Sequence, residues 1–503
     1  MRKFILLICF TISFWSCNDF LDQKNVQELT EESFWQNADD ARKAIVAAYS
    51  ALQAYDGSKW TFFEQMYIAV TWKSDGILNA PTDYGKSIAS FTNGTDDATF
   101  TSFWRSNYAG ISYANQIIEK VPEIESMSDA EKSSIIAEAK FLRGLYNFQL
   151  LIAFENIPLI TSTPSTPEDF FVFQSTPNEV WAQIEKDFGD AKQGLPSNWE
   201  GADIGRATKY TATAYLGKAF LFQEKFTEAV AEFNTVISSG VYNLLPNYAD
   251  NFNGLGENSA ESVFEIQWSA DRSNGNDERH PFNFEVTPGA LGGWELYYPS
   301  DWLFTEMQND LTDNSEFSDR VYASIFFDDP SSEMSDRYEG VNKSYDEVRN
   351  DLSHPIYFKK YTADYDLSFY NGINIHLMRY ADVLLMQAEA LNEIDQTSTA
   401  LDLVNQVRER SNATLLSGLS KDQLRDQIRH HERPVELAME YTIRWFDLYR
   451  WAKGSANHEP ISQTLTDHDK PFAENFVDGK HDIFPIPLSE MNINENLVQN
   501  PGY

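Results

Sequence analysis

The stretch Thr213–Val241, with the sequence TAYLGKAFLFQEKFTEAVAEFNTVISSGV, decides the fold. Five of its residues follow the spacing of a tetratricopeptide (TPR) repeat, which is a pair of antiparallel helices: Leu216, Gly217, Phe220, Ala229 and Phe233. The small residues among them let two helices approach closely, while the large ones fill the seam. The stretch therefore predicts a TPR-like helix pair. An unrelated helical hairpin is the alternative, because small and large residues alternate in many hairpins.

A fainter copy of the same pattern lies in the second half of the chain. Its residues keep the same offsets: Ala388, Leu391, Ala400, Val404 and Val407. Around the two copies, apolar residues recur at helical spacing over 31–240 and 371–454. The sequence thus predicts a mostly α fold with a scaffold of helix pairs, interrupted by a Pro-rich linker at Pro158–Pro177.

Three helices are expected in the second block, at Leu377–Glu393, Ala400–Ser411 and Pro434–Trp451. In the last of these, Glu440 can form an ion pair with Arg444 one helical turn further on.

Between the two helical blocks the composition changes. Residues 241–370 are rich in Gly, Asn, Asp, Ser and Pro interleaved with aromatics, and they include few strand-like pieces, such as Ser262–Trp268. Long irregular segments inside a compact protein usually carry function, so this is the expected ligand region. Residues 455–503 are predicted to be an irregular tail.

The chain begins as exported proteins do. A charged start, Met1–Lys3, precedes an apolar run, Phe4–Trp15, which suits a signal peptide rather than the roughly 20 apolar residues of a membrane span. Cys17 is predicted to be the lipidated first residue of the mature chain. Residues 14–16 fit a lipobox poorly, so an ordinary secreted or signal-anchored protein is the alternative. The expected organisation is a lipoprotein signal peptide at 1–16, a linker at 17–30 and a single domain at 31–503.

Composition excludes several classes of function. The formal net charge is −37, and such a charge repels polyanions, so nucleic acid is not an expected partner. The two cysteines, Cys9 and Cys17, leave with the signal peptide or carry lipid. The mature chain then has no thiol for disulfides or for cysteine-based metal or redox chemistry.

No arrangement of catalytic residues is evident in the sequence. His430, His431 and Glu432 resemble the start of a zinc-protease motif, but the position of its second histidine holds Val435. The sequence also lacks a G-x-S-x-G nucleophile elbow and a P-loop. We therefore expect a protein that is not an enzyme and that needs no cofactor or metal.

A series of longer motifs runs through nearly the whole chain in a fixed order. They are Cys17–Asp22, Asp40–Arg42, Ala137–Gly144, Arg379–Ala390, Asn405–Arg410, Glu432–Leu437, Arg444–Leu448, Pro485–Pro487 and Gln499–Tyr503. Together these motifs resemble the signature of the SusD/RagB family of nutrient-binding outer-membrane lipoproteins.

The resemblance implies four TPR-like helix pairs, a variable ligand face and a lid position over a SusC-like TonB-dependent transporter. It also implies a protein held by a lipid on Cys17, on the outer membrane and facing the cell exterior. The implied function is capture of an extracellular glycan for the transporter. Capture of peptides or protein fragments for a RagAB-like importer is the alternative, and a TPR scaffold that only holds proteins together is a third possibility.

Charged residues of the signature lie at helical spacings on otherwise apolar helices. We expect these residues to form structural ion pairs: Arg379, Asp382, Glu389, Arg408, Arg433, Glu436, Arg444 and Asp447.

Sugar binding needs a flat aromatic face beside polar side chains that meet hydroxyls. Two segments have this mixture. The predicted ligand-binding residues of the first are Trp72, Asp75, Asn79 and Tyr84, and those of the second are Trp294, Tyr297 and Tyr298. The two glycines before Trp294 would let its ring project from a loop. A weaker third group is Trp268, Arg272 and Asn274, whereas Trp104 and Trp302 are expected to be buried. The alternative for each aromatic is a place in the core or in an interface.

Overall fold

The computed structural model describes residues 34–54, 67, 69–79, 85–271, 273, 278–337, 339–362 and 371–503. The signal peptide, the linker at 17–30, Cys17, Tyr84, Arg272 and Asn274 lie outside these residues.

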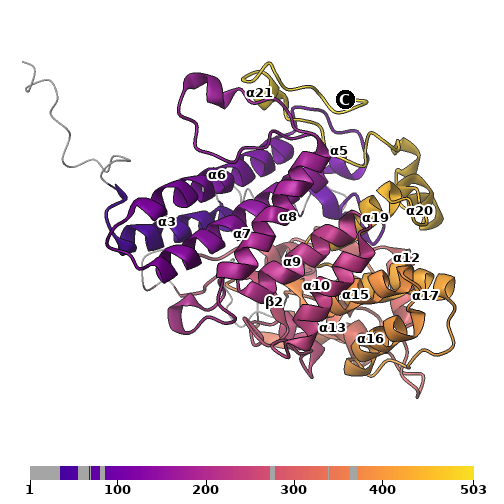
Figure 1. The fold of residues 1–503 in the computed structure, drawn as a ribbon. Helices are drawn as coiled ribbons and strands as arrows, with labels where there is room; N and C mark the ends of the chain where they lie inside the picture. Colours follow the sequence, from indigo (N-terminus) through magenta and orange to yellow (C-terminus); the bar gives the residue numbers. More distant parts are fainter. Residues whose placement is uncertain are drawn as a thin grey trace, which may run out of the picture.

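In the described part of the chain, eight long helices form four antiparallel pairs. The pairs are α3 (Ala38–Ser50) with α6 (Ala98–Lys120), α7 (Asp129–Phe154) with α8 (Pro177–Gly194), α9 (Lys209–Phe222) with α10 (Phe226–Ser238), and α15 (Tyr380–Glu393) with α16 (Thr397–Arg410). Each helix packs on the next one along this series, which crosses Figure 1 from α6 to α16. The first helices of successive pairs also touch one another. This arrangement confirms the predicted mostly α, TPR-like scaffold.

The pair α9–α10 shows why the repeat pattern gives a helix pair. Thr208 caps α9 by accepting a hydrogen bond from the backbone N–H of Thr211. Gly217 faces the ring of Phe233, and an added Cβ would lie 2.8 Å from that ring. Ala229 is fully buried in the same seam. The small residues therefore set how closely the two helices approach, as predicted.

The region between the two helical blocks holds short elements and much irregular chain. Its antiparallel strand pairs are β2 (Ser262–Ile266) with β8 (Ile375–Arg379), β4 (Ile325–Phe326) with β7 (Tyr357–Phe358), and β5 (Glu333–Asp336) with β6 (Val341–Ser344), and β3 (Tyr297–Pro299) pairs with β1 (Ile77–Asn79) from the front half. Its short helices are α11 (Phe282–Val286), α12 (Asp301–Gln308), α13 (Asp319–Ser324) and α14 (Tyr345–Val348). The predicted strand-like piece at 262–268 is confirmed as β2.

Two of the predicted helices differ from the structure. The segment predicted as one helix from Leu377 begins as strand β8, because these residues pair with β2, and α15 starts only at Tyr380. The segment Pro434–Trp451 is divided into α18 (Arg433–Glu436) and α19 (Ile443–Lys453). Between them Met439 and Thr442 have positive φ, which interrupts the helix. The predicted pairing of Glu440 with Arg444 is therefore wrong, since the two residues no longer lie on one helix.

The C-terminal tail returns to the front half of the chain, and its end lies above α5 (Lys86–Ala89) in Figure 1. It is mostly irregular, as predicted, but contains α20 (Ile461–Asp467) and α21 (Leu488–Met491). The backbone N–H of Phe484 donates to the carbonyl of Ala153 at 2.7 Å, and Asn500 Nδ2 donates to the carbonyl of Phe154 at 2.8 Å. These bonds attach the tail to the end of α7.

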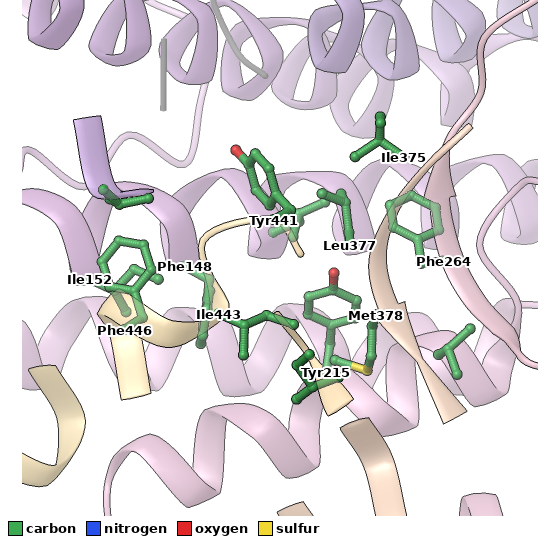
Figure 2. Close-up of a cluster of buried hydrophobic side chains, with 14 of the residues drawn as sticks. Phe148, Ile152, Tyr215, Phe264, Ile375, Leu377, Met378, Tyr441, Ile443 and Phe446 are labelled. Atoms are coloured by element: carbon green, nitrogen blue, oxygen red, sulfur yellow. The ribbon is translucent and has the colours of Figure 1, made fainter. Parts of the chain in front are cut away.

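A large apolar core extends from Ala41 to Leu497 and joins the scaffold to the other parts. Figure 2 shows one region of it, where side chains from α7, α9, β2 and β8 meet Tyr441, Ile443 and Phe446. The helix α17 (Lys421–Gln427) and the π-helical turn Ile428–Glu432 lead into this region.

Candidate functional site

The two segments that the sequence singles out for ligand binding lie side by side. Strands β1 and β3 pair in antiparallel fashion, with Asn79 opposite Tyr297 and Leu78 opposite Tyr298. Residues more than 200 positions apart in the sequence thus meet at one place. The pairing depends on tertiary structure, and no sequence pattern indicates it.

Trp72 and Tyr297 belong to the core. Both side chains have an exposed fraction of at most 1%, and their ring centroids are 5.5 Å apart. Gly85 lies directly against the Trp72 ring, where an added Cβ would clash with it. Neither ring presents a face to solvent, which corrects the expectation that the two rings contact ligand. The two rings instead contribute large apolar surfaces to the core.

Asp75 is also fully buried, and it serves as a structural anchor. Its carboxylate accepts from Arg444 Nε at 2.8 Å and lies 2.7 Å from His468 Nδ1. Burial alone would raise the pKa of Asp75, but the Arg444 guanidinium and His468 hold that pKa well below its usual range. The residue therefore joins the front segment, α19 and the C-terminal tail, which corrects its predicted role in ligand binding.

Other predicted aromatics are distributed as follows. Trp104 and Trp268 are buried, and Trp302 is partly buried with its ring stacked 3.8 Å from that of His468. The expectation for Trp104 is confirmed, and Trp268 gives no exposed face.

Among the predicted residues whose side chains the structure describes, Trp294 differs from the others because 46% of it is exposed. Gly292 has a φ of +91°, and a Cβ added at Gly293 would clash with the carbonyl oxygen of Thr287. The backbone N–H of Trp294 donates to the Phe284 carbonyl at 2.6 Å, which fixes the backbone beneath the ring. The two glycines thus allow the ring to project from the loop, as the sequence predicts.

The Trp294 ring stands on a second aromatic. It meets Phe284 edge-on with centroids 5.7 Å apart, and the Arg337 guanidinium lies 4.5 Å from the Phe284 centroid. This support holds the exposed ring in one orientation, as a stacking surface requires.

Polar groups surround the base of the loop. Glu295 accepts from the Gly289 N–H at 3.0 Å and from Ser353 Oγ at 2.9 Å. Tyr298 is 5% exposed, and its ring stacks on His354 with centroids 4.3 Å apart. A projecting tryptophan thus lies beside a carboxylate and a hydroxyl that are fixed by neighbours. Sequence reasoning missed Glu295, Ser353 and His354, because the last two follow more than 50 positions after Trp294.

The charged signature residues form a buried network, which confirms their predicted structural role. Arg379 forms ion pairs with Glu261, Glu436 and Glu440. Arg408 pairs with Glu432 and Asp310. Arg433 pairs with Asp382 and Asp447, and Arg450 pairs with Glu389. Arg320 completes it by pairing with Asp310, Glu432 and Glu436. The network fastens α13 and the residues that follow α12 and precede β2 to the helical scaffold.

Of the two histidines that resemble a zinc motif, His431 takes part in this network and His430 pairs with Glu459 instead. His431 lies 2.9 Å from Glu306 and 3.2 Å from Asp310. Burial would lower the pKa of His431, but the two carboxylates raise it to about 9. In the part of the chain that the structure describes, no group of three or more His, Cys, Asp and Glu side chains could hold a metal ion. Within the same residues, no helix is both long and apolar enough to cross a membrane.

Comparison with known proteins agrees with the motifs and the fold. A family model described as the SusD family matches residues 260–503, and one described as starch-binding and associating with the outer membrane matches residues 19–221. The chain belongs to the SusD family. This confirms the resemblance drawn from the motifs, and the two matches leave out only the start of the chain and 222–259.

Individual SusD-like proteins match over almost the full length. The SusD-like protein P2 of Formosa agariphila is 29% identical, and the match covers 100% of both chains. A SusD superfamily protein of Bacteroides vulgatus has a structure with a TM-score of 0.82 and 25% identity, covering 93% of this chain and 100% of that one. A laminarin-binding SusD-like protein has a TM-score of 0.73 and 26% identity, with coverage of 93% and 100%.

Proposed function

We propose that this SusD-like protein binds an extracellular glycan at the Trp294 loop and delivers it to a SusC-like TonB-dependent transporter. The observation that carries the proposal is the projecting Trp294 ring, held by two glycines and backed by Phe284. Membership of a family whose description includes starch binding supports it, as does the fold shared with a laminarin-binding protein.

The chemistry of the loop suits a neutral sugar. The face of an indole ring packs against the C–H groups of a pyranose, and Glu295 and Ser353 can exchange hydrogen bonds with its hydroxyls. The net charge of −37 disfavours polyanionic glycans. Trp294 is the sequence-predicted residue that stays in this proposed site, whereas Tyr298 is buried with its ring stacked on His354, which corrects its predicted contact with ligand. Asn79 and Tyr84 stay predictions.

Attachment and partner are further parts of the proposal. We infer a lipid on Cys17 that anchors the protein to the outer membrane with its ligand face toward the cell exterior. The n-region and apolar run before Cys17 support this, and so does the outer-membrane description of the matching family. Cys17→Ser should move the protein from the membrane fraction to the soluble fraction. Continued anchoring of this variant would contradict the lipid.

Glycan binding can be tested by affinity electrophoresis. A soluble form that starts after Cys17 is run in native gels with laminarin or starch. Binding should retard the protein, and Trp294→Ala should raise the apparent dissociation constant at least about tenfold, which corresponds to about 1.4 kcal/mol. Tyr113→Ala is the matched control, because this residue is 41% exposed on α6. Peptide binding without retardation by any glycan would instead support the peptide-capture alternative.

The transporter partnership has its own test. Mild detergent extraction of the full chain from its native membrane should co-purify a large β-barrel protein. Purification of the lipoprotein without any such barrel would contradict the proposed partnership.

A further inference from the structure

A cavity of about 450 Å³ lies between the β5–β6 hairpin, the chain around Phe252 and the residues that follow β7. This volume is within the roughly 300–1,000 Å³ that is typical of small-molecule sites. Phe252 and Met334 form an apolar part of its wall, and both are almost fully buried. The cavity does not include Trp294 or the residues that surround its loop.

Four polar side chains line this cavity without partners of their own. They are Glu333, Ser335, Asn342 and Lys359. In the described residues none of the four makes a side-chain hydrogen bond or an ion pair, and none is among the buried polar atoms without a partner, so all four reach solvent in the cavity. Lys359 is only partly exposed, and burial lowers the pKa of its ammonium while the charge of Glu333 opposes this. The Lys359 ammonium is not among the buried atoms without a partner, so it reaches solvent in the cavity. The donors and acceptors of the four side chains are therefore open to a ligand that enters the cavity.

The charges around the cavity indicate which ligand it takes. An ammonium and a carboxylate line the same space, and they interact electrostatically without direct contact. An anion would be repelled by Glu333 and by the negative net charge of the chain, and a cation would be repelled by Lys359. A hydroxyl group accepts from an ammonium and donates to a carboxylate, so a neutral polyol satisfies both groups. Its C–H faces would lie against the apolar wall.

The β5–β6 hairpin connects the cavity to the Trp294 loop. Met334 packs in one small apolar cluster with Leu291 and Tyr298. At the turn of the hairpin, the Arg337 N–H donates to the Leu291 carbonyl at 3.1 Å, and its guanidinium lies on Phe284 beneath Trp294. The hairpin therefore forms a wall of the cavity and also supports the aromatic platform.

We propose that the cavity lined by Glu333, Asn342 and Lys359 is a second saccharide-binding site, for a neutral sugar unit. The proposal rests on the glycan-binding function proposed above and adds a site that is separate from the Trp294 ring.

The test measures binding of laminarin oligosaccharides to the soluble protein by isothermal titration calorimetry. Lys359→Met keeps the apolar stem and removes the ammonium, and it should weaken binding at least about fivefold. Asn342→Ala, on the exposed hairpin strand, should weaken it as well and does not depend on refolding around a buried charge. Lys343→Met is the control, since this neighbouring lysine is already paired with Glu339 at 2.6 Å.

The outcomes separate the two sites. Weaker binding by Lys359→Met and Asn342→Ala, with Lys343→Met unchanged, supports the second site, and a Trp294→Ala/Lys359→Met double variant should then bind more weakly than either single variant. Wild-type affinity of Lys359→Met and Asn342→Ala, with loss in Trp294→Ala, overturns the second site and leaves the proposed function intact. If the wild-type protein binds neither laminarin nor starch and binds peptides instead, the proposed function fails, and this inference fails with it.

Discussion

Replacement of Arg379 by methionine tests how the ligand region is held on the helical scaffold. Arg379 is fully buried, and its guanidinium bonds Glu440 at 2.7 Å, Glu261 at 2.5 Å and Glu436 at 3.2 Å. Methionine fills a similar volume, so the change removes charge and hydrogen bonds rather than packing. The three carboxylates would then share the remaining cations of the network, chiefly Arg410 and Lys360.

Removal of one partner from a buried ion pair costs about 3–5 kcal/mol. For a chain of this length the unfolding entropy is on the order of 1 kcal/mol per degree, so Arg379→Met should lower the melting temperature by about 3–5 °C. Differential scanning calorimetry of the soluble protein measures this shift. The matched control is Arg42→Met on α3, whose side chain is 52% exposed and pairs with Asp39 and Glu131. An exposed pair contributes about 0–1 kcal/mol, so this control should shift the melting temperature by about 1 °C or less.

Equal shifts in Arg379→Met and Arg42→Met would refute the reasoning. That result would mean that the buried carboxylates are compensated without Arg379, and that the network does not hold the ligand region in place.

Three further changes test other parts of the structure. Asp75→Asn should destabilise the protein by about 3–5 kcal/mol, because it leaves the partly buried Arg444 without its counterion, and limited proteolysis should then cleave the C-terminal tail first. His431 has a folded-state pKa of about 9, raised above its usual 6.5, so it stabilises the fold fully below pH 6.5 and loses that effect, about 3 kcal/mol, as the pH rises through 9. Urea denaturation at pH 6 and pH 9.5 should therefore show a smaller pH dependence in His431→Gln than in the wild type. Gly217→Val should cost about 1–3 kcal/mol, measured by urea denaturation, because its Cβ would press on the Phe233 ring.

Each of these has a result that would contradict it. An intact C-terminal tail in Asp75→Asn would show that Arg444 and His468 do not hold it. An unchanged pH dependence in His431→Gln would place the stabilising charge elsewhere. For Gly217→Val the control is Gly189→Val on α8, where an added Cβ meets nothing within 4 Å, and equal losses in both would remove the close approach of α9 and α10 as the cause.

Much of the helical scaffold could be predicted because its signals are local. The spacing of Gly217, Ala229 and Phe233 defines a helix pair within one short stretch of chain, and the same offsets at Ala388 to Val407 define another. The helix boundaries that were predicted wrongly depend on residues that are distant in the sequence. Residues 377–379 form a strand because they pair with β2. Glu440 lies between α18 and α19, where it forms ion pairs with Arg379 and Lys360.

The candidate site likewise has a part that could be predicted and a part that could not. The two glycines directly before Trp294 predict that its ring projects from the loop, and in the structure that ring is exposed. Trp72 has an equally polar neighbourhood in the sequence, yet it is buried beneath Gly85 and beside Tyr297. By itself the sequence determined the helix pairs, the family and the residue types available for binding, since periodicity and motif order are properties of the chain. Only the tertiary structure decided which aromatic rings face solvent and which charges pair, because burial and ion pairing depend on residues that are distant in the sequence and meet only when the chain folds.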